Sequence, residues 1–390
     1  MNTLSSSVEV GSFDEAIEFI YAKGWTDGLP VIPATPERVT EFLEYVGLEP
    51  DAILGELPER DRVIHAEKLA VNAIMAGCKK EYLPVLIAAV EAISEPRFRF
   101  NHLASMGSPA PILILGGPIV NELGFNYERG VMGPSPARAN ATVGRALSLL
   151  LWNCAEWRPD RVQRGTYGNP LRWASCCIAE NPNETGWTTL REDLGFEKHD
   201  STVTVVSISG GYTDVWTKKP DPVDTLMSIA DAIVTGGGNF NRGVYVVLMA
   251  PPIVDRLAKQ GWDRQAARSW LLENAGWTIA GLKRRGRWGL SSPDVEGFPA
   301  GISSTEADQN DDRYVRLFKS NGALDHLLWD KGQIERDADV YIVATGGDVS
   351  ARTLVMAEYA LSTNPVTKKI RPATSRPPIQ TADAMSGAVD

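Results

Sequence analysis

Short apolar runs that alternate with helical segments constrain the fold of this chain more than any other feature. Three such runs lie at 202–208, 244–249 and 340–344, and segments of helical character at 223–234 and 264–273 lie between them. Short apolar strands alternating with helices are typical of a parallel sheet whose faces are covered by helices. We therefore expect a parallel, helix-covered α/β sheet in the C-terminal half.

The N-terminal half has a different pattern, which indicates a mixed α+β arrangement. Thr35 is a good N-cap and Pro36 suits the first helical position, so a helix is expected from there to about Val46. Further helices are expected at 14–22, 66–76, 81–93 and 135–153, and strands at 111–115 and 173–179. The predicted fold class is α/β, with an α+β domain at 1–200, an α/β domain at 201–370 and a disordered tail at 371–390.

Charge, hydropathy and cysteine usage exclude several classes of protein. The 390 residues carry a formal net charge of −10, and an acidic surface repels phosphate backbones, so nucleic acid is not an expected partner. No apolar run reaches the roughly 18 residues of a membrane span, and the start of the chain does not resemble a signal peptide. Four cysteines, two of them adjacent, suit reduced thiols better than a disulfide framework. We expect a cytoplasmic protein without membrane association.

The adjacent cysteines stand at the end of a predicted strand, in the stretch WASCCIAENPNETGW. One interpretation is a site in which Cys177 is a nucleophilic or redox thiol, Glu180 transfers protons and Asn181 positions the substrate. These residues lie where α/β sheets place ligands, at the carboxyl end of a strand. The alternative is that both cysteines are small buried apolar residues and the polar residues form a turn.

A second candidate site lies at the start of the helix expected in GPSPARANATVGRAL. Arg138 and Arg145 fall on one face of that helix, and the amino end of a helix attracts anions. One interpretation is that a carboxylate or phosphate of the substrate binds there. The alternative is an ordinary capped helix whose arginines bond to neighbouring loops. Asp27 lies in a glycine and proline turn and is a weaker candidate, because aspartate commonly forms turns. Cys78 follows a glycine that ends a helix, and a structural role competes with thiol chemistry there.

Glycine clusters lie at 209–211, 236–238 and 345–348, but none matches a nucleotide-binding motif. No cofactor is assigned from the sequence. The four histidines form no local metal motif, so a metal site would have to gather distant ligands. The residues for such a site are His65, His102, Glu180 and Cys177.

Four stretches, GWTDGLPVIPATPERV, AVNAIMAGCKKEYLPVLIAAVEAI, GPSPARANATVGRAL and CIAENPNETGW, occur in this order. Read together they resemble a UGSC-like family of bacterial proteins of unassigned chemistry, sometimes labelled thioredoxin although this chain has no CxxC. The resemblance implies that Cys177 with the Glu-Asn after it, Cys78 and the Arg-Ala-Asn-Ala run are site residues. It thereby adds Asn140 to the substrate-binding candidates.

The segment 337–370 is similar to the UGSC domain itself, in which a glycine–aspartate turn leads into redox residues at the start of a helix. Here the turn remains as Gly347-Asp348, but Val349 to Arg352 replace the redox positions. The resemblance implies a helix after this turn, with Arg352 in its first turn as an anion ligand in place of thiol or selenol chemistry.

Three functions remain open at this point. The first is a catabolic enzyme that uses thiol-assisted acid/base chemistry on a small anionic substrate. The second is a non-catalytic subunit whose partner is a UGSC-type redox protein, and the third is a metal-dependent lyase or hydratase. A homo-oligomer is compatible with each of them.

Overall fold

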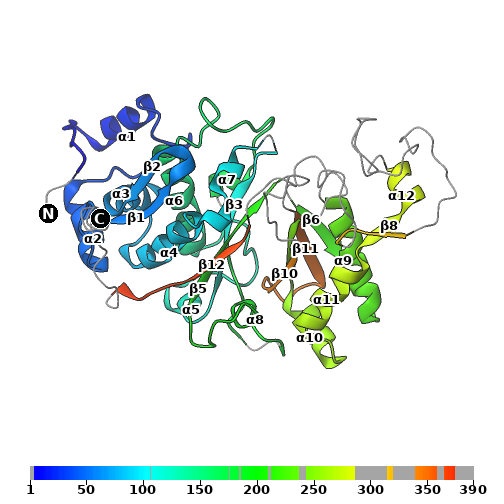
Figure 1. The fold of residues 1–390 in the computed structure, drawn as a ribbon. Coiled ribbons are helices and arrows are strands. Elements are labelled where there is room, and N and C mark those ends of the chain that lie inside the picture. Colours follow the sequence, from blue (N-terminus) through cyan, green and yellow to red (C-terminus); the bar gives the residue numbers. More distant parts are fainter. Residues whose placement is uncertain are drawn as a thin grey trace, which may run out of the picture.

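Two four-stranded sheets packed face to face form the centre of the molecule, and helices cover the outer face of each (Figure 1). The computed structural model describes residues 4–105, 107–174, 176–183, 186–209, 212–236, 243–285, 314–318, 339–357 and 364–373. The arrangement confirms the α/β class.

The first sheet has the strand order β12 (Val366–Lys369), β5 (Thr202–Ile208), β3 (Ala110–Gly116), β4 (Cys177–Ala179). β3 and β4 are parallel, and the other neighbours are antiparallel. Its outer face packs on α4 (Leu83–Ile93) and α6 (Arg138–Cys154), and α3 (Ala66–Ala76) packs on α6.

The second sheet has the order β10 (Asp339–Ala344), β7 (Val244–Met249), β11 (Arg352–Ala357), β6 (Tyr212–Trp216). Again one pair is parallel, β10 with β7, and the other two pairs are antiparallel. Its outer face packs on α9 (Pro222–Gly236), α10 (Pro251–Lys259) and α11 (Arg264–Asn274). The sheet is therefore mixed, and the expectation of a parallel sheet in this half is not confirmed.

Alternation along the strands explains the four layers. In β3, Leu113 and Leu115 face the helices, whereas Ile112 and Ile114 face the second sheet. In β7 the odd-numbered residues face the helices, while the even-numbered residues at 244–248 meet the first sheet. Because both faces of β3 and β7 are buried, these two strands are continuous apolar runs in the sequence.

The edge strands are exchanged between the sheets. β6 follows β5 in the chain but joins the second sheet, and β12 follows β11 but joins the first. The predicted domain boundary at residue 200 falls just before β5, which pairs with β3 on one side and with β12 on the other. That domain division stays a prediction.

Three sequence expectations about local structure are wrong. Residues 352–357 form β11 and not a helix, so Arg352 lies on a strand, where it pairs with Asp214 and stacks on Trp216. The strand expected at 173–179 is shortened to β4, because α7 (Leu171–Ala174) precedes it. The helix expected from Ser135 begins at Arg138. The tail from 374 onward lies outside the described residues.

Smaller elements complete the described chain. None of its helices combines the length and apolar character that crossing a membrane requires. The remaining elements are α1 (Phe13–Ala22), α2 (Pro36–Val46), β1 (Ile53–Leu57), β2 (Arg62–His65), α5 (Ile119–Glu122), α8 (Leu190–Asp193), β8 (Gly276–Thr278), α12 (Ile279–Arg284), β9 (Tyr314–Arg316) and the 3-10 turns at Pro58–Arg60, Lys80–Tyr82, Pro96–Phe98 and Phe100–Ala104.

Candidate functional site

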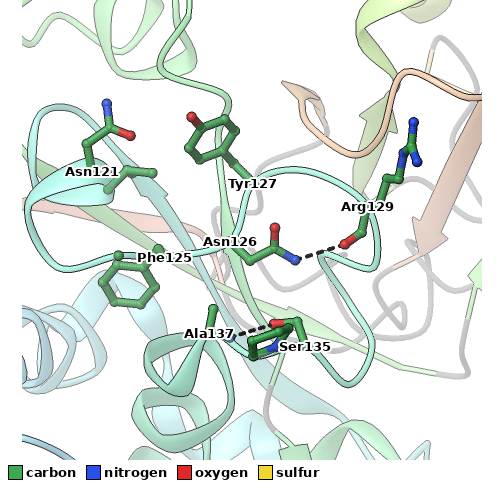
Figure 2. A pocket seen from close by; sticks show the side chains of 10 residues that line it. Asn121, Phe125, Asn126, Tyr127, Arg129, Ser135 and Ala137 are labelled. Atoms are coloured by element: carbon green, nitrogen blue, oxygen red, sulfur yellow. Dashed lines mark hydrogen bonds between the residues drawn. The ribbon is translucent and has the colours of Figure 1, made fainter.

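A pocket lies in front of the amino end of α6, under the loop that joins α5 to α6 (Figure 2). We call it the α6 pocket. It has a volume of about 420 Å³, is open to solvent, and is lined by Val120, Asn121, Gly124, Phe125, Asn126, Tyr127, Arg129, Ser135, Pro136 and Ala137. α6 has 17 residues, and the first N–H groups of such a helix have no partner within it and carry its positive dipole end. The setting suits an anionic or polar ligand.

The loop that lines the pocket is fixed to the first sheet by one buried amide. Asn140 accepts from the N–H of Asn126 at 2.7 Å and donates to the Asn126 carbonyl at 2.9 Å. Its second N–H donates to the Cys177 carbonyl at 2.9 Å. Both donors of Asn140 are thus satisfied within the protein. The side chain holds the pocket loop to β4, and it is not among the lining residues.

The glycine turn at 345–348 supports the same loop from the second sheet. Thr345 Oγ1 donates to the Ala179 carbonyl at 2.7 Å, and the N–H of Gly346 donates to the Tyr127 carbonyl at 2.9 Å. Arg129 pairs with Asp348 at 2.9 Å. A Cβ at Gly347 would lie 2.4 Å from Arg129 Cγ, so a side chain there would displace Arg129. The turn that the sequence analysis singled out therefore borders the pocket.

Burial controls the chemistry of the thiols. Cys177 faces the helices, and burial raises the pKa of its thiol well above the usual value, with further increases from the Cys176 and Cys78 thiols. Burial also raises the pKa of Cys78 to about 12, and this thiol donates to the Thr142 carbonyl. Cys176 faces the second sheet, with its pKa raised by burial to about 11. These surroundings stabilise the protonated thiol, whereas a nucleophilic cysteine must be in its thiolate form.

Glu180 belongs to a buried charge cluster between the two sheets. It accepts from the Leu190 N–H at 2.8 Å and from Arg264 Nη2 at 2.9 Å, and Arg264 also lies 3.5 Å from Asp193. Glu180 and Arg264 side chains are only 3% and 2% exposed, so water does not screen the pair. Burial raises the pKa of Glu180, and the nearby charge of Arg264 opposes that rise. The carboxylate connects β4 to α8 and α11, away from the pocket lining.

The backbone N–H of Asn181 donates to the Ala344 carbonyl, which joins the two sheets where β4 and β10 end. Its side-chain oxygen accepts from the Asn183 N–H at 2.9 Å. That bond forms a turn, as the alternative interpretation of this stretch expected.

The predicted anion ligands are engaged within the protein. Arg138 donates to the Gly77 carbonyl at 2.6 Å and to the Cys78 carbonyl at 3.4 Å, which fixes the end of α3 to the start of α6. Arg145 forms two hydrogen bonds, 3.0 and 2.8 Å long, to the carboxylate of Asp27. The structure therefore brings Asp27 and Arg145 together, but as a mutual ion pair and not around the α6 pocket.

The ligands of the metal hypothesis are not gathered. His65 Nδ1 bonds with the Asp51 carbonyl, and His102 Nε2 bonds with Arg99. In the part of the chain that the structure describes, no group of three or more His, Cys, Asp or Glu side chains is placed to hold a metal ion.

Sequence reasoning located the amino end of α6 but missed the loop in front of it. Asn121, Tyr127 and Arg129 supply polar side chains to the pocket. The signal was available, because the run FNYER lies in the connection between the apolar run at 111–115 and the helix start near 135. In Figure 2 the Arg129 side chain extends away from Ser135 and Ala137, toward the C-terminal turn.

No protein-family model matches this chain, and a search of curated proteins gives no match. Membership of the UGSC-like family therefore stays a prediction. The fold and the pocket together define an α/β protein with a candidate small-molecule site.

Proposed function

We propose that this chain is an enzyme that acts on a small anionic molecule bound in the α6 pocket. The observation that carries the proposal is the position of the pocket, directly at the amino end of a long helix. That end attracts negative charge and offers N–H donors. A carboxylate or phosphate group of the substrate would lie there, as the sequence analysis expected, but without contact to Arg138.

The pocket supplies further donors. The side chains of Asn121 and Tyr127 make no hydrogen bond among the residues that the structure describes, and the Ser135 hydroxyl accepts from the Ala137 N–H but is free to donate. Such groups orient a polar substrate in a site of this size. Arg129 lies at the rim, where its guanidinium is shared with Asp348.

Proton transfer is assigned to Tyr127. Among the ten lining residues only Tyr127 and Arg129 have titratable side chains, and arginine stays protonated. A tyrosine hydroxyl is a competent general acid. Cys177 and Cys78 have no such role in this proposal, because both are buried in their protonated form. The backbone carbonyl of Cys177 instead accepts a hydrogen bond from Asn140, the residue that holds the pocket loop.

The test is calorimetric titration of the purified chain with succinate, benzoate and glycerol 3-phosphate. We expect saturable binding of at least one anion, weakened in Tyr127→Phe and Arg129→Met. Arg62→Met is the matched control, because Arg62 is an exposed arginine with an acidic partner, Glu156, and is not part of the pocket lining. Equal binding by the wild type and all variants would show that the anion does not bind in the α6 pocket.

A second candidate is a non-catalytic subunit of a UGSC-type redox protein. It is favoured by exposed apolar side chains near the altered turn, with Val349 69% exposed and Trp216 54% exposed beside Arg352. Copurification of a small UGSC-type protein that is lost in Trp216→Ser would support it. Turnover of a substrate by the isolated chain would contradict it.

A further inference from the structure

A second group of polar side chains is buried on the helix side of the first sheet, where β3 begins and β5 ends. Ser207 is fully buried, and Gln163 and Ser209 are each 7% exposed. The Nε2 of Gln163, both serine hydroxyls and the Nε of Arg172 are buried without a hydrogen-bond partner. We call these four residues the Arg172 cluster. Buried polar groups are normally satisfied, so four such atoms in one region require a reason.

Several contacts bring the cluster together. Arg172 Nη2 donates to the Pro109 carbonyl at 3.0 Å, just before β3. The ladder pairs Ala110 with Ile208, which places Ser209 beside this point and Ser207 one pair further along. By the alternation of β5, Ser207 shares the face of Val205, which packs on the helices, and Ser209 follows directly after the end of the strand.

Gln163 is brought to the same place by its own loop. A Cβ built on Gly165 would lie 2.7 Å from Gln163 Nε2 and 1.8 Å from the hydroxyl of Ser108, the residue before Pro109. The amide and Ser108 are therefore close neighbours. The loop needs glycine at position 165 because any side chain there would collide with Ser108.

The charge of Arg172 is not compensated. Its guanidinium stacks on the Trp157 ring at 3.6 Å, and within the described part of the chain no carboxylate pairs with it. Burial lowers the pKa of Arg172 to about 9, so the group is still charged at neutral pH. A buried cation is costly unless an anion accompanies it.

We propose that the Arg172 cluster binds a compact anion bearing oxygen acceptors, either a carboxylate or inorganic phosphate. The guanidinium would supply charge, and the Gln163 amide and the two hydroxyls would donate to the remaining lone pairs. None of these residues lines the α6 pocket, so the site is separate from that of the proposed function and does not depend on it.

The experiment compares the full chain with Arg172→Met and Ser209→Ala in titrations with phosphate and acetate at constant ionic strength. We expect the affinity of the preferred anion to fall by about tenfold or more in Arg172→Met, the effect of losing a charge-assisted hydrogen bond, and by less in Ser209→Ala. Arg62→Met is the control and should bind as the wild type does, because Arg62 is an exposed arginine that belongs to neither site. Equal binding by wild type and Arg172→Met would overturn the proposal.

Crystals of the wild-type chain soaked in bromide test anion binding at the Arg172 cluster without any variant, and so do not depend on whether a variant folds. An anomalous peak within hydrogen-bond distance of Arg172 supports the proposal, and the phosphate and acetate titrations then distinguish the two sources of oxyanion. Ordered water alone at Arg172 would overturn it.

Discussion

The two sheets share one strand pattern but differ at the ends of their parallel pairs. The N–H of Glu180, after β4, donates to Leu115 of β3, and the N–H of Thr345, after β10, donates to Met249 of β7, so these two residues hold equivalent positions. Glu180 inserts its own carboxylate into a buried cluster with Arg264, the first residue of α11. Thr345 carries no charge, and its hydroxyl donates to the carbonyls of Tyr127 in the pocket loop and of Ala179 at the end of β4.

The comparison shows that one fold element has two uses. Arg138, the first residue of α6, is the counterpart of Arg264. It donates to carbonyls at the end of α3, and among the residues that the structure describes no carboxylate pairs with it. At α11 the chain itself supplies the anion, whereas at α6 a pocket remains. We interpret the first arrangement as structural and the second as the place for a ligand.

The largest expected effect concerns the charge cluster. Arg264→Met should lower the free energy of unfolding by about 3–5 kcal/mol, the range for removing one partner of a buried ion pair, because Glu180 is left without its counter-charge. Urea unfolding followed by circular dichroism measures this. The double variant Glu180→Gln with Arg264→Met should recover part of the loss. A loss below about 1 kcal/mol would mean that the cluster is hydrated, and the contrast with Thr345 would disappear.

The next effect tests whether the two sheets unfold together. Ile178→Ala and Val246→Ala remove side chains from opposite sides of the same inter-sheet layer. Each should cost about 2–4 kcal/mol and shift one common unfolding transition, since the cavity lies between the sheets. Differential scanning calorimetry would show two separate transitions, each shifted by only one variant, if the predicted division at residue 200 describes independent domains.

A smaller effect comes from alkaline pH. The raised thiol pKa values mean that the unfolded chain loses its thiol protons near pH 9, while folded Cys176 keeps its proton to about pH 11 and folded Cys78 to about pH 12. The free energy of unfolding is therefore unaffected by these thiols below pH 8.5 and falls as the pH rises above 9. At pH 10 the loss is about 1–2 kcal/mol for each thiol.

Unfolding titrations at pH 8 and pH 10 should show a smaller pH-dependent loss in Cys176→Ala than in the wild type. Alkylation of the native protein tests the two thiols separately, because Cys176 faces the second sheet and Cys177 faces the helices. Both should react slowly at pH 7.5. Rapid labelling of Cys177 alone would restore its role as an activated thiol and remove the basis for assigning proton transfer to Tyr127.

The smallest effect on stability is expected at the pocket rim. Asp348→Asn breaks an exposed ion pair with Arg129, and exposed pairs contribute little, so the unfolding transition should stay within experimental error. Anion binding in the α6 pocket should strengthen in this variant, because Arg129 is released from its competing carboxylate. Calorimetric titration against wild type measures the change, and weaker binding would show that Asp348 positions Arg129 for the ligand.

The sequence predicted strands β3, β5, β7 and β10 and most helices, because apolar runs such as 244–249 and the Thr35-Pro36 helix start report local preferences that the fold does not override. It did not predict strands β6, β11 and β12, because these short segments contain polar residues and do not form continuous apolar runs. Their pairing depends on partners far away in the chain. The exchange of edge strands therefore had no local signal.

The candidate site was only half predictable for the same reason. The helix start and the glycine turn at 345–348 were visible as motifs, but their meeting at one loop depends on how the sheets stack. The sequence also could not show that Arg138, Arg145 and Glu180 bind partners within the protein. The identity of a charged residue does not indicate whether its side chain faces a ligand or another part of the chain.

The exchanged edge strands have a consequence for synthesis on the ribosome. β5 leaves the ribosome long before β12, the strand that covers its free edge through the pairing of Val205 with Val366. Until then β5 presents unpaired backbone groups to the cell, and such edges are where chains associate wrongly. The edge of β5 therefore stays uncovered until residues 366–369 have been synthesised, and the yield of folded protein should depend on the speed of translation after β5.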